Sequence, residues 1–174
     1  MYELLSRINS PADVKKLNEG ELTALAAEIR EALFNRLTKI GGHFGPNFGI
    51  VEAEIAMHYV FSSPIDKFVF DVSHQSYTHK ILTGRKAGYI DDASFKEDSG
   101  YTNPGESEHD LFNVGHTSTS ISLATGLCKA REMLGGSWNV VALIGDGSLS
   151  GGEALEGLNV AGSEIKSNLI IIVN

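Results

Sequence analysis

Two short apolar runs, separated by one helix-like segment, constrain the fold of this chain most strongly. The runs are WNVVALI, residues 138–144, and NLIIIVN, residues 168–174. Between them, Ser150-x-x-Glu153 has the spacing of a capping box and predicts a helix from there to about Ala161. Strands that alternate with helices are typical of parallel strands covered by packed helices. We therefore predict an α/β fold with a parallel sheet flanked by helices.

The remaining segments fit the same class. Apolar spacing predicts helices over residues 19–39, 50–61 and 120–134, and KFVFDV, residues 67–72, has the composition of a buried strand. Glycine, proline and charged residues predict loops over 41–49 and 85–110. The length of 174 residues suits one domain, which we assign to residues 1–174. Because the last apolar run reaches Asn174, we expect this domain to be truncated at its C-terminal end.

Composition excludes several classes of partner. The net charge of -8 argues against a nucleic-acid or anionic-membrane surface, since both require basic patches. No apolar run approaches the ~18 residues of a membrane helix, and the N-terminus lacks the pattern of a secretory signal. The single Cys128 cannot form an internal disulfide. These features predict a cytoplasmic protein without a nucleic-acid or membrane partner.

The residues after the first of the two runs point to a ligand. Ligands of parallel sheets bind beyond the carboxyl ends of the strands, where the segments after Val72 and Ile144 should lie. Glycine-rich turns there usually bind phosphate, yet Gly145-Asp146-Gly147 contains a carboxylate. A Mg²⁺ ion between them would allow a phosphate and the carboxylate to share this turn, because Mg²⁺ uses one or two protein oxygens together with phosphate oxygens.

Asp146 is accordingly a candidate metal ligand, and Gly147 and Ser148 are candidates to offer N–H groups to a diphosphate. A P-loop is absent, because it needs Gly-Lys-Ser or Gly-Lys-Thr. A dinucleotide fingerprint would need glycine where Ser150 stands. The alternative is that Asp146 only caps backbone N–H groups of a turn.

Longer stretches resemble a known family. GDGSLSGGEALEGLNVAG followed by NLIIIVN resembles the thiamine-diphosphate motif of the transketolase superfamily. GGHFGPNFGIVE, FDVSHQSYTHKILTGR and ESEHDLFNVGHTSTSIS resemble, in the same order, segments of the 1-deoxy-D-xylulose-5-phosphate synthase family. The resemblance covers nearly all of the chain beyond about residue 30. It implies a thiamine-diphosphate-binding fold, of which this chain would be the diphosphate-binding domain.

The resemblance also assigns residues to the cofactor. It implies that Asp146 binds Mg²⁺ and that the cofactor is contacted by Gly147, Ser148, His74 and the segment Gly115, His116 and Thr117. Without the resemblance, the hydroxyl-rich residues after Gly115 would be read as a helix N-cap, and both roles can coexist. Asn174 aligns with the first asparagine of an Asn-Asp-Asn sequence whose second asparagine is the other ligand. The spacing leaves open whether Asn174 or a later residue binds the metal.

Two histidines are implied to be catalytic, His43 and His74. Histidine can transfer protons or bind oxyanions near neutral pH. The chain departs from the family at three places. Ser73 replaces the usual glycine before His74, FGPN at 44–47 replaces Leu-Ala-Ser-Asn, and Asn103-Pro104-Gly105 stands where Lys-Arg is usual.

The reaction implied by the resemblance is the condensation of pyruvate with glyceraldehyde 3-phosphate to 1-deoxy-D-xylulose 5-phosphate and CO₂, with thiamine diphosphate and Mg²⁺. In the family, a glutamate on a second domain activates the cofactor. We therefore expect this segment to be inactive alone and to act as part of a longer chain, a homodimer or a complex with a partner chain. Two alternatives remain open: a transketolase or split transketolase-like subunit, and a non-catalytic cofactor-binding module.

Overall fold

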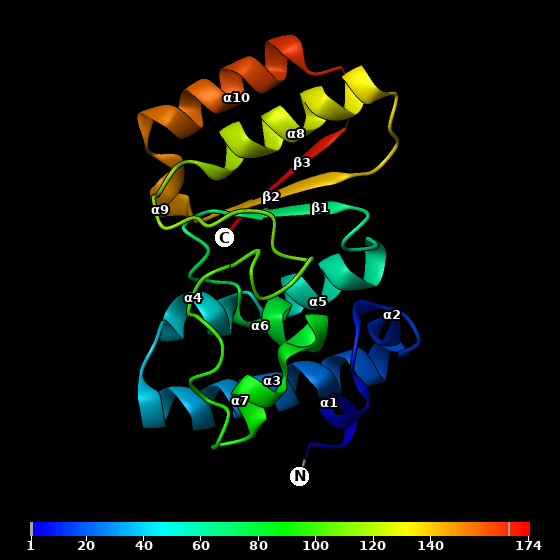
Figure 1. The fold of residues 1–174 in the computed structure, drawn as a ribbon, viewed down its shortest axis with the longest axis vertical. Helices are drawn as coiled ribbons and strands as arrows, with labels where there is room; N and C mark the ends of the chain where they lie inside the picture. The colour runs from blue at the N-terminus through cyan, green and yellow to red at the C-terminus, as the bar shows by residue number, and fades with distance from the viewer. Residues whose placement is uncertain (1, 167) are drawn as a thin grey trace. The chain divides into compact units, whose positions relative to one another are not determined.

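The structure, a computed structural model, describes residues 2–166 and 168–174 (Figure 1). The chain divides into two compact units. The helical unit comprises the residues up to Ser62 together with His74–Gly100, and the sheet unit comprises Ser63–Ser73 and Tyr101–Asn174. Each unit is described separately below. The assignment of residues 1–174 to one diphosphate-binding domain stays a prediction.

The helical unit consists of short helices around one long helix. The long helix is α3, Glu19–Ile40. The others are α1 (Glu3–Arg7), α2 (Pro11–Val14), α4 (Phe44–Gly49), α5 (Val51–Val60), α6 (Tyr77–Lys80), a π-helical turn η1 (Ile81–Arg85) and α7 (Ala87–Ile90). In the part of the chain that the structure describes, no helix combines the length and apolarity needed to cross a bilayer.

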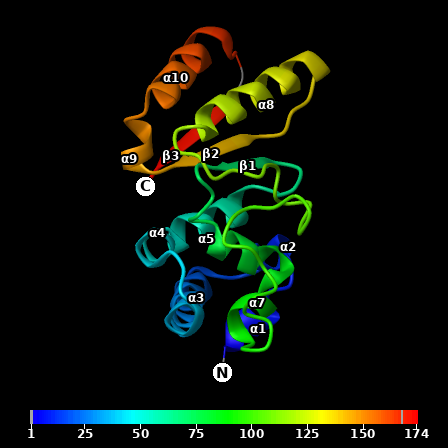
Figure 2. The same cartoon turned by 60° about the vertical axis from the view of Figure 1, so that its left-hand side comes forward.

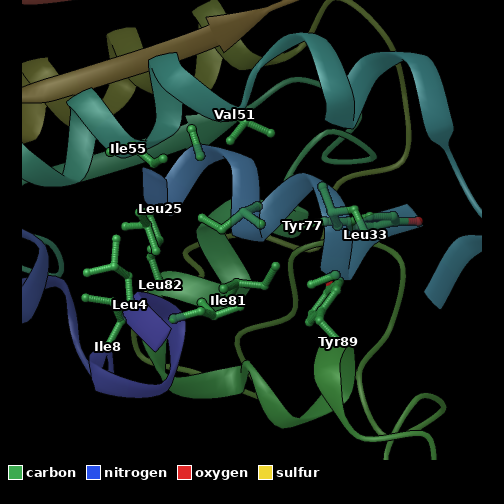
Figure 3. Close-up of a cluster of buried hydrophobic side chains, with 14 of the residues drawn as sticks. Leu4, Ile8, Leu25, Leu33, Val51, Ile55, Tyr77, Ile81, Leu82 and Tyr89 are labelled. Carbon is green, nitrogen blue, oxygen red and sulfur yellow. The ribbon is translucent and has the colours of Figure 1, made fainter. Parts of the chain in front are cut away.

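Local signals determine the limits of α3. The Asn18 side chain accepts a hydrogen bond from the Glu21 N–H, and the Glu21 carboxylate accepts one from the Asn18 N–H, which forms a capping box. At the other end Gly41 has a φ of 79°, which glycine adopts without strain. The apolar side of α3 is buried against α1, α5, α6 and η1, and Figure 3 shows their side chains meeting in one core, with Leu25 and Leu33 from α3.

The sheet unit is built on three parallel strands in the order β1-β2-β3. They are β1 (Lys67–Phe70), β2 (Val140–Ile144) and β3 (Leu169–Val173). The helices are α8 (Ser120–Leu134), α9 (Asp146–Leu149) and α10 (Gly152–Glu164). Both views show α8 and α10 on the same face of the sheet (Figures 1 and 2). All five residues of β2 are buried, as a central strand with apolar residues throughout requires.

The parallel α/β arrangement confirms the predicted fold class, but several local predictions were wrong. The segment 41–49 contains the helix α4, and the segment 85–110 contains α7 and the buried Tyr89 and Phe95. The Ser150 capping box does not form. Gly151 is the N-cap of α10, while the Ser150 hydroxyl donates to the Gly147 carbonyl at 2.7 Å. The Ser150 side chain is thus used inside the turn that Asp146 begins.

Candidate functional site

The carboxyl ends of β2 and β3 lie next to each other in the sheet unit. The Asp146 N–H donates to the Asn174 carbonyl at 2.9 Å, and the Asn174 N–H donates to the Ile144 carbonyl at 3.0 Å. The parallel pairing of Ile144 with Val173 sets this register. The structure therefore brings the Gly-Asp-Gly sequence and Asn174 to one edge of the sheet, as the strand pattern predicts.

Asp146 is exposed at this edge and has one oxygen engaged. The Gly147 N–H donates to Asp146 Oδ1 at 2.7 Å, so the side chain does cap a turn. The space where side chains would stand on Gly145 and Gly147 is open. An exposed carboxylate beside an uncrowded glycine backbone fits a magnesium diphosphate, because Mg²⁺ prefers oxygen ligands and retains several that are not protein groups. Among the described residues, no three His, Cys, Asp or Glu side chains are grouped to hold a metal.

A second loop of the sheet unit contacts the Gly-Asp-Gly segment. The Ser118 hydroxyl donates to the Ser148 carbonyl at 2.6 Å. A Cβ on Gly151 would lie 2.0 Å from Ser118 Oγ, so only glycine allows this approach. The structure thus places Gly115, His116 and Thr117, which are all exposed, in the same region as Asp146, Gly147 and Ser148. Gly115 and His116 line a hollow together with Ser122 and Glu153.

Asp71 shapes the loop that carries these residues. Its buried carboxylate accepts three hydrogen bonds, from the N–H groups of Ser118 (3.0 Å), Thr119 (2.8 Å) and Ser120 (3.0 Å). A carboxylate at the N-terminus of α8 satisfies N–H groups that lack partners within the helix and interacts favourably with the helix dipole. The hydroxyl-rich sequence predicted a local N-cap here, whereas the cap comes from Asp71, the residue that follows β1.

Ser73 connects two further segments of the sheet unit. Its hydroxyl donates to the Val114 carbonyl at 3.0 Å and accepts from the Thr102 N–H at 3.1 Å. Its φ is 68°, in the left-handed region that favours glycine. This conformation gives a physical reason for the glycine that is usual here in the resembling family, and the hydroxyl contacts are what serine adds.

The two predicted catalytic histidines meet within the helical unit. The His43 and His74 rings are 5.1 Å apart between centroids and cross at 73°, in an edge-to-face arrangement, and both side chains are half-buried. The Tyr77 hydroxyl lies 3.5 Å from the His43 N–H and 3.4 Å from His43 Nδ1. The hydroxyl accepts from the N–H, and its own hydrogen can be donated to Nδ1 in the tautomer that has the ring hydrogen on Nε2.

Asn47 contacts both histidine segments, and sequence reasoning did not identify it. Its fully buried amide donates to the His43 carbonyl at 2.8 Å and to the His74 carbonyl at 2.8 Å. Asn47 is the one residue of FGPN that keeps the usual family residue, and that agreement was the available signal. Asp71 was missed as well, and its only signal was a carboxylate at the end of a strand.

A third group that the sequence did not reveal lies in the helical unit around Glu54. This residue is fully buried, accepts from the His79 N–H at 2.7 Å and has no partner for Oε1 among the described residues. Burial raises the pKa of the Glu54 carboxyl well above 4.5, and the hydrogen bond from His79 lowers it by less. His79 Nδ1 lies 3.0 Å from His58 Nε2, so one of these nitrogens carries the shared hydrogen.

The parallel sheet, with helices on one face and a Gly-Asp-Gly turn after its central strand, is consistent with a thiamine-diphosphate-binding fold. The family model described as 1-deoxy-D-xylulose-5-phosphate synthase matches residues 5–174. The chain therefore belongs to the 1-deoxy-D-xylulose-5-phosphate synthase family.

Curated relatives agree over the whole chain. The chain is 51% identical over 174 residues to 1-deoxy-D-xylulose-5-phosphate synthase 1 of Geobacter sulfurreducens. It is 48% identical over 174 residues to the 1-deoxy-D-xylulose-5-phosphate synthase of Pelotomaculum thermopropionicum, and 49% over 173 residues to that of Chlorobaculum tepidum. These alignments cover 100%, 100% and 99% of the chain but 27% of each relative. The chain thus spans about a quarter of the length of these relatives.

Proposed function

We propose that this chain supplies the diphosphate-binding part of a thiamine-diphosphate- and Mg²⁺-dependent transferase. The whole enzyme would condense pyruvate with glyceraldehyde 3-phosphate to 1-deoxy-D-xylulose 5-phosphate and CO₂, a step toward isoprenoid precursors, thiamine and pyridoxal. The observation that supports this most is the Ser118–Ser148 hydrogen bond, which joins the two cofactor loops expected from the resemblance. Family membership supports the choice of reaction.

In this proposal the sheet unit holds the cofactor. Asp146 would bind Mg²⁺ through its carboxylate. If Oδ1 turned to the metal, the Gly147 N–H that it now accepts from would be free to donate to a phosphate oxygen. Ser148, Gly115, His116 and Thr117 would complete the contacts. Asn174 stays a candidate for the second ligand, since its backbone is paired with Asp146.

When bound, thiamine diphosphate supplies the nucleophilic carbon for decarboxylation and transfer. The chain itself would position groups and move protons. His43 and His74 would hold or transfer protons at substrate oxygens, because an imidazole nitrogen can donate or accept a hydrogen bond and carry a proton. In the tautomer in which His43 Nε2 is a donor, Nδ1 would accept from the Tyr77 hydroxyl.

The proposal also includes the location of the enzyme and its partner chains. We place it in the cytoplasm, as a homodimer or with a partner chain that supplies the activating glutamate. The transketolase and non-catalytic alternatives are not favoured, because the family model and the relatives described above carry the synthase name. One departure from the family concerns the segment where Lys-Arg is usual. In this chain Asn103-Pro104-Gly105 stands there and forms a turn, in which the Asn103 side chain accepts a hydrogen bond from the Gly105 N–H at 2.9 Å.

The test is turnover by the longest natural form of the protein. Labelled pyruvate, thiamine diphosphate and Mg²⁺ would be supplied with and without glyceraldehyde 3-phosphate, and CO₂ release would be recorded. The proposal expects release that the aldehyde stimulates and a five-carbon phosphorylated product. Cofactor binding without pyruvate turnover would instead indicate a transketolase-type donor or a binding role.

A further inference from the structure

The loops that carry His43 and His74 are far apart in the sequence and need a connection to keep the two rings in contact. His43 is the residue before α4, and His74 lies before α6. One side chain contacts the backbone of both loops. Asn47, in α4, donates from Nδ2 to the His43 carbonyl and to the His74 carbonyl, at 2.8 Å each.

The amide of Asn47 is suited to this position by its hydrogen-bonding groups. Both Nδ2 hydrogens have acceptors, and Oδ1 accepts from the Tyr77 N–H at 3.1 Å. The reverse orientation of the amide would set an oxygen against two carbonyls and a donor against an N–H, so the contacts fix its orientation. With an exposed fraction of 0%, this side chain has no access to solvent as a substitute partner.

The contact with His74 exceeds what α4 requires for its own stability. The bond to the His43 carbonyl spans four residues and helps to form the start of α4. The bonds to the His74 carbonyl and the Tyr77 N–H span 27 and 30 residues. They hold the second histidine loop at the first one.

We propose that Asn47 is a positioning residue that fixes His43 and His74 relative to each other. The inference rests on the proposed function, which gives these histidines catalytic roles. Asn47 acts through the backbone carbonyls of the two histidines, to which its hydrogen bonds are made. Loss of its donors lets the two loops separate, and a shift of about 1 Å in a catalytic group can lower a rate by roughly 100-fold.

The test is Asn47→Asp in the longest natural form of the protein. Aspartate keeps the acceptor for the Tyr77 N–H and loses both amide donors. The expected result is a fall in kcat of about 10- to 100-fold. Part of kcat should return as the pH is lowered, because the introduced carboxyl, once protonated, can donate to one carbonyl. Asn35→Asp, the same change at an exposed position of α3, is the matched control and should leave kcat within about twofold.

Crystal structures of the variants provide a readout that does not depend on turnover. The ring-centroid distance of 5.1 Å should persist in Asn35→Asp and increase in Asn47→Asp. Unchanged rings, or a loss of kcat with the rings in place, would overturn the inference. If Asn47→Asp does not fold, Asn47→Ser, which adds no charge, is measured in the same way. Absence of pyruvate turnover by the unmodified protein would refute the proposed function, while the ring distance would still test the role of Asn47.

Discussion

The Asp71 carboxylate accepts a hydrogen bond from the Ser118 N–H at 3.0 Å, across 47 positions of the sequence. The same carboxylate accepts from Thr119 and Ser120, so a residue that follows β1 caps the N-terminus of α8. The Ser118 side chain in turn contacts the Gly-Asp-Gly segment. Asp71 therefore supports the geometry of the candidate cofactor loops without belonging to them.

Replacing Asp71 with Asn should destabilise the sheet unit. The remaining oxygen can still accept from Thr119 and Ser120, but an amide NH₂ would face the Ser118 N–H. Loss of one charge-assisted hydrogen bond in a buried place predicts a decrease of about 1.5–3 kcal/mol in the free energy of unfolding. Urea denaturation measures it. Glu156→Gln, at an exposed position of α10, is the control. Equal stability of the two variants would mean that the cap contributes nothing.

Two variants of Ser73 separate the effect of its hydroxyl hydrogen bonds on stability from the effect of its left-handed backbone conformation. Ser73→Ala removes the hydroxyl bonds to Val114 and Thr102 and keeps a side chain at a φ of 68°. Ser73→Gly removes the same bonds and also the left-handed strain, which is worth about 1 kcal/mol. Thermal or urea unfolding should therefore rank the glycine variant about 1 kcal/mol more stable than the alanine variant. The reverse order would show that strain at Ser73 is not significant.

The burial of the Glu54 carboxyl predicts that the stability of the protein depends on pH. Its folded-state pKa lies well above 4.5, so between pH 4.5 and that raised value the unfolded chain loses this proton while the folded chain keeps it. Stability from this residue therefore decreases as the pH rises through that range. Glu54→Gln, which cannot ionise, should gain stability relative to wild type by about 1.4 kcal/mol per pH unit there.

Denaturation of wild type and of Glu54→Gln at several pH values from 4.5 upward tests this prediction. The difference between wild type and Glu54→Gln is the quantity to follow, because the other ionisable groups are the same in both proteins, including the His79–His58 pair beside Glu54. Glu31→Gln, exposed on α3, should show no such trend. A difference that stays constant with pH would mean that Glu54 ionises as readily in the folded protein as in the unfolded chain.

The sequence predicted those parts of the fold that depend on local patterns. The apolar runs 138–144 and 168–174 contain β2 and β3, which are neighbouring parallel strands, and the spacing of 120–134 gives α8 with the predicted limits. Gly135 ends that helix with a left-handed φ of 65°, as glycine commonly does. Interactions between residues close together in the sequence were sufficient to predict these elements.

Features that depend on distant partners could not be predicted. Asp71 and Asn47 act on residues 27 or more positions away, and no local period marks such residues. The Ser150-x-x-Glu153 spacing was misleading, because the Ser150 hydroxyl is taken by Gly147 in the preceding turn. The roles of His43 and His74 came from resemblance to a family, whereas that of Asp146 came first from its place in a glycine-rich turn after a strand, and all three stay predictions.

The central claim, that Asp146 holds a magnesium diphosphate at the end of β2, can be measured by calorimetric titration of the longest natural form of the protein with thiamine diphosphate. Wild type should bind in the presence of Mg²⁺ and at least tenfold more weakly with a chelator. Asp146→Ala should bind weakly under both conditions, while Asp92→Ala, an exposed aspartate of the helical unit, should behave as wild type. Mg²⁺-dependent binding that is unchanged in Asp146→Ala would contradict the claim and leave Asp146 as a turn cap.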